Sequence, residues 1–341
     1  MSHQVAGSEP KSLGLVLGSS LPPEELVPVA VQADELGLDE LWFSEDCFFT
    51  GGISGATAAL AATSRIQVGL GIVSAMLRHP ALLAMEVATM ARAFPDRLAV
   101  GIGLGVPAWL RQVGRSPGSA LGAMTECVTA VRQLVAGERL CVAGEEFLFD
   151  DVALAHPVTS PPPIYMGVSG PRMLQLSGEL ADGSILSVGG GVNYLTWARQ
   201  QIDAGRSRAG RTGPHRVTAF ALYAVDRDRQ RARDEVRGPL AFYTAAGGAN
   251  AMTDVEGTSD VLRGMLDRGG AEIVAREMPE SWLEDLSVSG TPEDCARGIR
   301  SLYEAGADSV ALFPVSVGRT QEMAQLTAAE VIPLLRQDGC R

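Results

Sequence analysis

The sequence predicts an α/β fold in which eight parallel strands close into a (β/α)8 barrel carrying inserted segments. Short β-branched or apolar runs alternate with segments of helical periodicity, which is typical of a parallel sheet covered by helices. Glycines gather where several strands end, and parallel α/β proteins bind ligands there. With 341 residues and 46% hydrophobic composition, the chain is long enough for one closed barrel.

The alternation can be followed along the whole chain. Strands are expected over residues 13–18, 40–45, 66–73, 97–103, 164–168, 184–188, 216–225 and 309–313. Helices are expected over residues 23–36, 55–62, 80–94, 121–136, 171–181, 194–208, 292–305 and 322–336. Eight such units favour a closed barrel over an open doubly wound sheet.

The clearest unit spans residues 66–103. A glycine-interrupted strand runs into a short polar loop, and Pro80 then opens a helix, where its missing N–H is no loss. The helix buries one stripe of apolar side chains at helical spacing, Leu83, Val87, Met90 and Phe94. Pro95 and Asp96 end it, and the next strand follows directly.

Three segments interrupt this pattern: a hairpin, a helical insertion and a flexible corner at Gly189-Gly190-Gly191 after the sixth strand. Residues 1–12 are expected to form a polar leader, and residues 13–341 a single barrel domain. Residues 139–149 predict a hairpin with its turn at Ala143-Gly144. Residues 227–275 are charged and helix-rich with a break at Gly247-Gly248, so they predict a helical insertion after the seventh strand.

Composition and charge exclude several classes of protein. The net charge is −12 without a basic stripe, which argues against a nucleic-acid partner or an anionic membrane. No apolar run is long enough to span a bilayer. The cysteines are scattered and form no C-x-x-C pair, so neither a disulfide framework nor a metal site is expected, and a cytoplasmic location is predicted.

Glycines follow the strand over residues 97–103. Gly101, Gly103 and Gly105 suggest a dinucleotide fingerprint, but Val106 occupies the place of its third glycine, and the next helix is expected only after Pro117. The better interpretation is a strand end where backbone approaches a ligand without Cβ obstruction. A tight barrel corner remains the alternative.

A second glycine-rich loop lies at residues 166–172. The strand ends in Gly167-Val168-Ser169-Gly170, and Pro171 then begins a helix. Free N–H groups and the positive end of the helix dipole form an anion site suited to phosphate. A loop and helix start without a ligand is the alternative.

The second strand ends in two acids and a cysteine. Glu45 and Asp46 should point to opposite faces of a strand, so at most one of them would line the barrel mouth. Cys47 is interpreted as a small buried residue rather than a nucleophile. His79 is interpreted as a helix-start or packing residue rather than a base.

Together these segments resemble the bacterial luciferase-like superfamily of TIM-barrel flavin and deazaflavin enzymes. The resemblance is greatest to the branch that uses coenzyme F420, which includes methylenetetrahydromethanopterin reductase and F420-dependent glucose-6-phosphate dehydrogenase. It covers about residues 13–336. It rests on Gly71-Ile72-Val73, Arg78-His79-Pro80, Arg97-x4-Ile102-Gly103-x-Gly105, Pro163 to Pro171, Ala181-Asp182-Gly183 and Gly290 to Asp294.

The resemblance implies a cofactor site. A cis Gly71–Ile72 peptide would support the deazaflavin ring, Asp46 would lie beside it, and Gly167–Gly170 would bind phosphate. The implied cofactor-binding residues are Asp46, Gly71, Ile72, Val73, Gly103, Leu104, Gly105, Gly167, Val168, Ser169 and Gly170. Candidate pocket walls are Cys47, Phe48, Phe49, Met76 and Trp109, and candidate partners of the cofactor's anionic tail are Arg78, Arg111 and Arg172.

Two departures from that branch shape the predicted activity. Its sugar-phosphate dehydrogenases have Asp-His where this chain has Asp46-Cys47, and an acid often stands where Val106 does. We therefore expect a reductase that moves a hydride from F420 to an activated C=C, C=N or C=O bond of a small substrate, with no catalytic residue assigned. An FMN-dependent monooxygenase and a non-catalytic flavin-binding protein are the alternatives, and a homodimer is expected.

Overall fold

The computed structural model describes residues 10–337, so most of the predicted leader and Cys340 lie outside the described residues. Eight parallel strands close into a barrel in the order β1-β2-β3-β4-β7-β8-β9-β11, and β11 pairs back with β1. This confirms the predicted fold class. The barrel strands are β1 (Ser12–Leu17), β2 (Glu40–Phe43), β3 (Gln67–Ser74), β4 (Leu98–Gly103), β7 (Ile164–Gly167), β8 (Gly183–Leu186), β9 (Arg216–Val225) and β11 (Ser309–Pro314).

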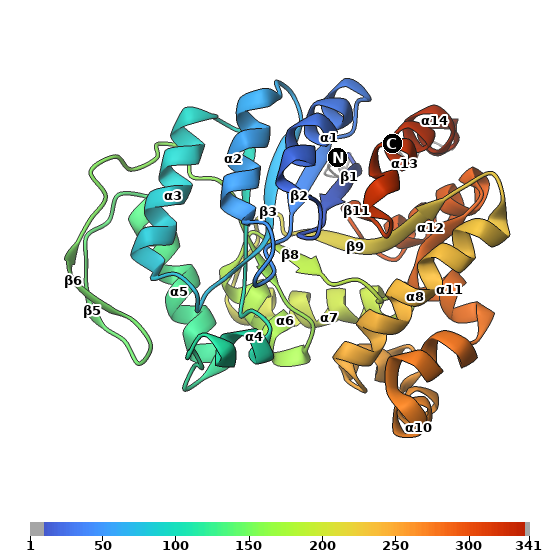
Figure 1. Cartoon of the computed structure of the whole chain (residues 1–341). Coiled ribbons are helices and arrows are strands. Elements are labelled where there is room, and N and C mark those ends of the chain that lie inside the picture. The colour runs from blue at the N-terminus through green and yellow to red at the C-terminus, as the bar shows by residue number, and fades with distance from the viewer. Residues whose placement is uncertain (1–9, 338–341) are drawn as a thin grey trace, which may run out of the picture.

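The barrel strands are buried along nearly their whole length, because helices cover the outside and side chains fill the inside. The covering helices are α1 (Pro23–Glu35), α2 (Gly52–Ala62), α3 (Pro80–Ala93), α5 (Ala120–Val135), α6 (Pro171–Leu180), α7 (Val192–Arg208), α12 (Pro292–Glu304) and the C-terminal run α13 (Thr320–Leu326) and α14 (Ile332–Gln337). Figure 1 shows α1, α2 and α3 side by side along one side of the barrel.

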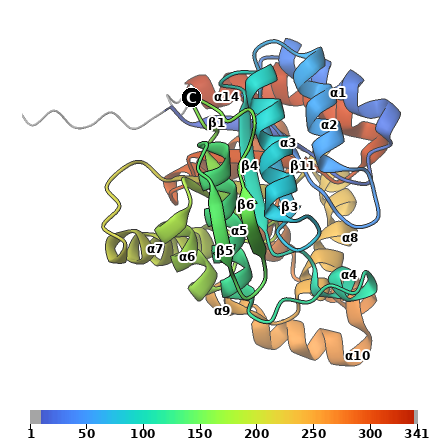
Figure 2. The ribbon, with the colours of Figure 1, turned by 90° about the vertical axis from the view of Figure 1, so that its left-hand side faces the viewer.

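Two segments project from opposite sides of the barrel (Figure 1). The predicted hairpin is present as β5 (Leu140–Ala143) and β6 (Leu148–Val152), and in Figure 2 it lies over α5. The predicted insertion is helical and runs further than expected, to Leu286. Its helices are α8 (Arg229–Gly247), α9 (Ala251–Val255), α10 (Ser259–Glu277) and α11 (Glu280–Leu286).

The helical segment returns to the barrel through a strand that the sequence did not predict. This strand, β10 (Val288–Gly290), pairs in parallel with the end of β9, with Val288 opposite Tyr223 and Gly290 opposite Val225. At only three residues, β10 is too short to show a pattern in the sequence.

Two further expectations need correction. The helix α4 (Pro107–Gln112) begins two residues after Gly105, whereas the next helix was expected only after Pro117. The last predicted helix is not uniform, because the π-helical segment Thr327–Val331 separates α13 from α14. Within residues 10–337, no helix is both long and apolar enough to cross a bilayer.

Candidate functional site

A cavity of about 470 Å³ opens among the carboxyl ends of the barrel strands. Its walls come from β3, β4, β7, β8 and β9 and from loops at the carboxyl ends of the strands, including the loop after β2. Ligand sites of (β/α)8 barrels lie at this end. The predicted site residues that line it are Asp46, Cys47, Gly71, Ile72, Gly103, Leu104, Gly105, Trp109, Gly167, Val168, Ser169 and Gly170.

The floor of the cavity is shaped by an irregularity in β3. The register of β3 against β4 shifts between Leu70 and Val73, and the Gly71–Ile72 peptide is cis, as predicted. The shift turns Ile72 toward the cavity. A Cβ on Gly103 would lie 2.7 Å from Ile72 Cδ1, and one on Gly167 would lie 2.7 Å from Ile72 Cγ2. Both neighbours must therefore be glycine for Ile72 to occupy this place.

Gly105 closes the β4 side of the site. Its φ is +95°, a conformation that side chains rarely adopt, and a Cβ there would lie 2.7 Å from Ser74 Oγ. Ser74 Oγ donates a hydrogen bond to Leu104 O at 2.8 Å and so ties the end of β3 to this loop. Trp109 follows on α4 and lines the cavity.

The loop from β7 to α6 forms the neighbouring wall, because β7 pairs with β4. Gly170 is the N-cap of α6 and supplies no side-chain cap, so the first N–H groups of the helix have no capping side chain. A Cβ on Gly170 would meet no atom within 4 Å. The hydroxyl of Tyr194 donates to Ser169 O at 2.7 Å and fixes the loop. This uncapped helix start offers donors and a positive dipole to an anion.

The end of β2 differs from the expectation. The strand stops at Phe43, so the two acids that follow lie in a loop where strand alternation does not apply, and Glu45 and Asp46 both line the cavity. Asp46 accepts a hydrogen bond from Ser19 Oγ at 2.6 Å. Burial, followed by the charges of Glu45 and Asp46, raises the pKa of the Cys47 thiol. The Cys47–Phe48 peptide is cis, like that at Gly71–Ile72.

Several predicted site residues do not line the cavity. Val73 is fully buried on the other face of β3, because Ile72 and Ser74 face inward. Phe48 and Phe49 extend into solvent, with 67% and 61% of their surface exposed. Met76 lines a separate small pocket beside Arg115 and Phe147.

The structure also adds residues that the sequence analysis missed. Ile185 on β8 and Phe220 on β9 point into the barrel, and Leu77 and Met173 come from the β3–α3 loop and α6. The strand positions lie in runs that are apolar on both faces, so the sequence does not indicate which side chains face inward.

Two of the described histidines, His79 and His215, take structural roles. His79 is the N-cap of α3, accepts a hydrogen bond from Ala81 N at 3.2 Å and packs against Phe147 and Phe149, as predicted. His215 lies buried near the start of β9 and hydrogen-bonds Ser184 Oγ. Among residues 10–337, no cluster of His, Cys, Asp or Glu is arranged to hold a metal ion.

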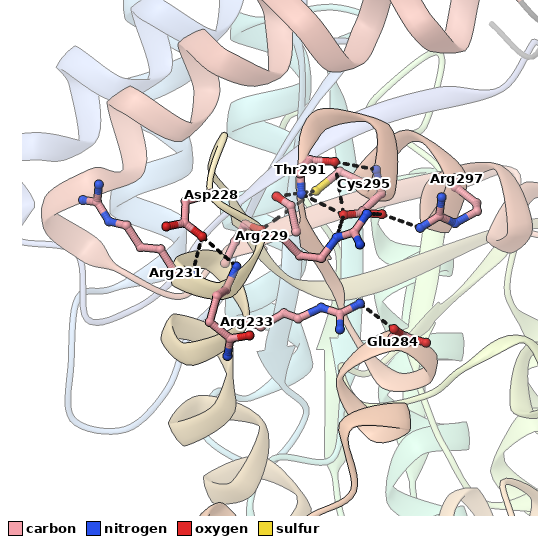
Figure 3. Close-up of polar contacts among 12 residues, drawn as sticks. Asp228, Arg229, Arg231, Arg233, Glu284, Thr291, Cys295 and Arg297 are labelled. Carbon is pink, nitrogen blue, oxygen red and sulfur yellow. Dashed lines mark hydrogen bonds and ion pairs between the residues drawn. The ribbon is translucent and has the colours of Figure 1, made fainter.

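A second cavity of about 310 Å³ lies outside the barrel, between β10, α11 and α12. Its arginines already have acidic partners. Arg233 contacts Glu284 at 2.5 Å, as Figure 3 shows. Arg297 contacts Asp294 at 2.5 Å. Because these charges satisfy one another, the cavity inside the barrel is the better candidate for a cofactor site.

Comparisons with known proteins agree with this geometry. The chain is 29% identical over 313 residues to 5,10-methylenetetrahydromethanopterin reductase of Archaeoglobus fulgidus, covering 89% of this chain and 93% of that one. It is 28% identical over 333 residues to F420-dependent glucose-6-phosphate dehydrogenase of Nakamurella multipartita, covering 92% and 93%.

Among solved structures, the coenzyme F420-dependent tetrahydromethanopterin reductase of Methanopyrus kandleri superposes with a TM-score of 0.84 at 21% identity, covering 95% of this chain and 99% of that one. This likeness is one of fold. The profile of the family described as luciferase-like monooxygenase matches residues 4–309. The chain therefore belongs to the luciferase-like monooxygenase family.

Proposed function

We propose that this protein is an F420-dependent oxidoreductase that transfers a hydride between the deazaflavin and a small organic substrate. The proposal is supported by relatives that match nearly the whole chain and are named as F420-dependent dehydrogenases or as a methylenetetrahydromethanopterin reductase. The main structural support for the proposal is the floor of the cavity. There, Ile72 lies at the register shift in β3 and packs against Gly103 and Gly167.

The residues present fit such a cofactor. The cavity volume of about 470 Å³ lies in the range of small-molecule sites, and its lining is mainly apolar, as a ring system requires. The uncapped start of α6 at Gly170 provides N–H donors for a phosphate, with open space where a side chain would project. An apolar floor and an anion site thus lie in one cavity.

The chain's own residues would then hold and orient the two reactants. Ile72 and Trp109 supply apolar walls that exclude water from the ring, and Gly167–Gly170 would bind the phosphate. Asp46 offers a carboxylate oxygen to a hydrogen-bond donor of the ring or the substrate. F420, when bound, supplies a two-electron hydride donor or acceptor.

A reductase is favoured over a sugar dehydrogenase by the groups that could move a proton. Within the described chain no histidine lines the cavity, and Val106 stands on the wall where relatives often carry an acid. The thiol of Cys47 is held protonated by its raised pKa. An activated C=C, C=N or C=O bond needs less help from a base than an alcohol does.

A parallel titration with F420 and FMN tests the cofactor assignment. We expect F420 to bind the purified full-length chain with a dissociation constant at least roughly tenfold below that of FMN, a difference of about 1.4 kcal/mol. Quenching of F420 fluorescence and the FMN spectrum measure the two affinities. Micromolar binding of FMN without binding of F420 would overturn the assignment.

An FMN-dependent monooxygenase on the same barrel is the second candidate, because the family that the chain belongs to is described by that activity. It predicts a visible flavin spectrum in the purified protein and oxygen consumption with reduced FMN. A non-catalytic flavin-binding protein predicts tight binding of the cofactor without hydride transfer to any of a broad panel of substrates.

We also propose that the protein is a cytoplasmic homodimer. The cysteines among residues 10–337 are free thiols, which suits a reducing compartment.

An apolar surface supports the dimer: Leu82 and Met85 on α3 and Val142 and Leu148 on the neighbouring hairpin are at least half exposed. Light scattering should give twice the monomer mass of 35.8 kDa. A monomer that persists at micromolar concentration would contradict this assembly.

A further inference from the structure

An ion pair between two loops lies at one end of the cavity. Arg78, in the β3–α3 loop, meets Glu45, in the β2–α2 loop, through two parallel contacts of 2.5 and 2.8 Å. The Glu45 side chain is only 9% exposed and the Arg78 side chain 27% exposed. A pair of this geometry is bidentate and fixes both partners in place.

Both carboxylate oxygens of Glu45 already have partners. Oε1 accepts from Arg78, and Oε2 accepts from Arg78 and from Gly52 N at 3.2 Å, at the first residue of α2. Arg78 Nε also lies 3.6 Å from Glu86 Oε2, an oxygen that is buried and accepts no hydrogen bond from the described residues, so Arg78 faces two carboxylates and makes its two hydrogen bonds to Glu45. Although Glu45 lines the cavity, its charge is compensated and its hydrogen-bonding capacity is largely used.

Asp46, the next residue, is in the opposite situation. Within residues 10–337, the Ser19 hydroxyl is the one side-chain partner of its carboxylate, and no cation pairs with it. Its charge acts on the neighbouring thiol: burial, then the charge of Glu45 and then that of Asp46 raise the pKa of Cys47, while Arg78 lowers it. Glu45 and Asp46 thus lie in one cavity wall, but Arg78 forms an ion pair with Glu45 and not with Asp46.

We propose that Arg78 is a positioning residue that acts through Glu45. It holds the β2–α2 loop against the cavity and leaves Asp46 as the uncompensated charge at this end. Such a wall favours substrates that present an uncharged or positively polarised group there over phosphorylated ones. The substrate preference rests on the proposed function, whereas the charge arrangement does not.

Alkylation of Cys47 measures this charge in the ligand-free protein. Iodoacetamide is neutral and iodoacetate is anionic, so the ratio of their rates at Cys47 reports the local potential and cancels changes in thiolate fraction. Mass spectrometry of the Cys47 peptide separates this thiol from the other cysteines. Arg78→Met exposes the charge of Glu45 and should raise the iodoacetamide-to-iodoacetate ratio roughly two- to tenfold.

Two further variants distinguish the effect of charge on the ratio from the effect of a more mobile β2–α2 loop. Glu45→Gln leaves Arg78 unpaired and should lower the ratio, a change of opposite sign that loosening does not produce. The double variant Glu45→Gln/Arg78→Met has no net charge change and should return the ratio to within roughly twofold of the wild type. Arg92→Met on α3, where the guanidinium donates to Pro157 O at 2.8 Å, is the matched control and should leave the ratio unchanged.

The proposal is overturned if Arg78→Met lowers only the melting temperature and leaves the ratio unchanged. It is also overturned if the double variant keeps the ratio of Arg78→Met. Neither result depends on F420, so a failure of the cofactor assignment remains distinguishable. If both proposals hold, Arg78→Met should raise KM for anionic substrates more than for neutral ones, with a smaller change in kcat.

Discussion

At the scale of single residues, Gly170 shows how the lack of a side chain can prepare a site. It is the N-cap residue of α6 but has no side-chain oxygen to accept a hydrogen bond from the first N–H groups of the helix. The space where a side chain would project is open. The positive end of the helix dipole therefore faces the cavity without compensation. An anionic group of a ligand can take the place that a capping side chain would fill.

This arrangement gives a prediction for Gly170→Asp. The new carboxylate should cap α6 and repel a phosphate, so the affinity for F420 should fall roughly tenfold or more while the fold is retained. Fluorescence titration and thermal melting measure the two effects. Gly213→Asp is the control, because a Cβ there also meets nothing within 4 Å but lies away from the cavity. Equal affinity of both variants for F420 would remove this loop from the site.

Residue patterns predict the β7–α6 loop well, because Gly-x-Ser-Gly followed by proline is a local signal. They fail where side-chain direction depends on long-range pairing. Gly71, Ile72 and Val73 were all expected at the site, but after the register shift in β3 Ile72 faces the cavity and Val73 does not. Because β2 ends at Phe43, both Glu45 and Asp46 line the cavity. Arg78, the ion-pair partner of Glu45, is 33 residues away in sequence. A single sequence carries no signal for either event.

At the scale of elements, Asp294 at the start of α12 joins the helical segment to the barrel through Arg229 at the start of α8. Its side chain is buried at the start of α12 and accepts hydrogen bonds from Arg229 at 2.6 and 2.8 Å, from Arg297 and from Thr291. Burial alone would raise the pKa of Asp294, but the hydrogen bonds outweigh it and hold the pKa well below its usual range.

Asp294→Asn should therefore lower the free energy of unfolding at pH 7 by about 1–3 kcal/mol. The sign of the pH dependence follows from the depressed pKa: the stabilisation is present above the unfolded pKa of about 3.9 and is lost as pH falls below it. Urea denaturation at pH 7 and pH 3.5 should show the gap to wild type narrowing in acid. Asp260→Asn, at an exposed ion pair, should change stability little at either pH.

Long elements were predicted from the sequence more accurately than short ones. Long periodic helices such as α3 and α5 match the expected ranges within one residue at each end. The sequence did not indicate the six-residue α4 or the three-residue β10, because neither is long enough to repeat its period clearly and α4 has no capping side chain. Short elements of this kind include α4, which supplies Trp109 to the wall of the barrel cavity.

At the scale of the whole molecule, one buried histidine affects how stability depends on pH. Burial, followed by the charges of Arg206, Arg199 and Arg211, lowers the pKa of His215 to about 4. In the unfolded chain its pKa is about 6.5, so the unfolded state binds the proton first. Stability from this group is complete above pH 6.5 and falls as the pH drops toward 4.

At pH 5 the protonation of unfolded His215 should cost about 2 kcal/mol of stability. His215→Gln should therefore give a flatter stability profile between pH 7 and pH 5 than the wild type, whatever its effect at neutral pH. Denaturant titrations at three pH values in that interval measure the slope. The same substitution at the exposed His156 should leave the slope unchanged, and a parallel profile for His215→Gln would contradict the assignment.

Because β10 pairs with the end of β9, the helical segment begins and ends at the same place on the barrel. The chain leaves the barrel after Val225 and rejoins it at Val288, and Asp226 N donates to Gly290 O at 3.1 Å. Since its two ends are anchored to each other, the length between them can vary at small entropic cost without disturbing the barrel register. Exchanging or shortening this segment should therefore leave the strands that form the floor of the barrel cavity in place.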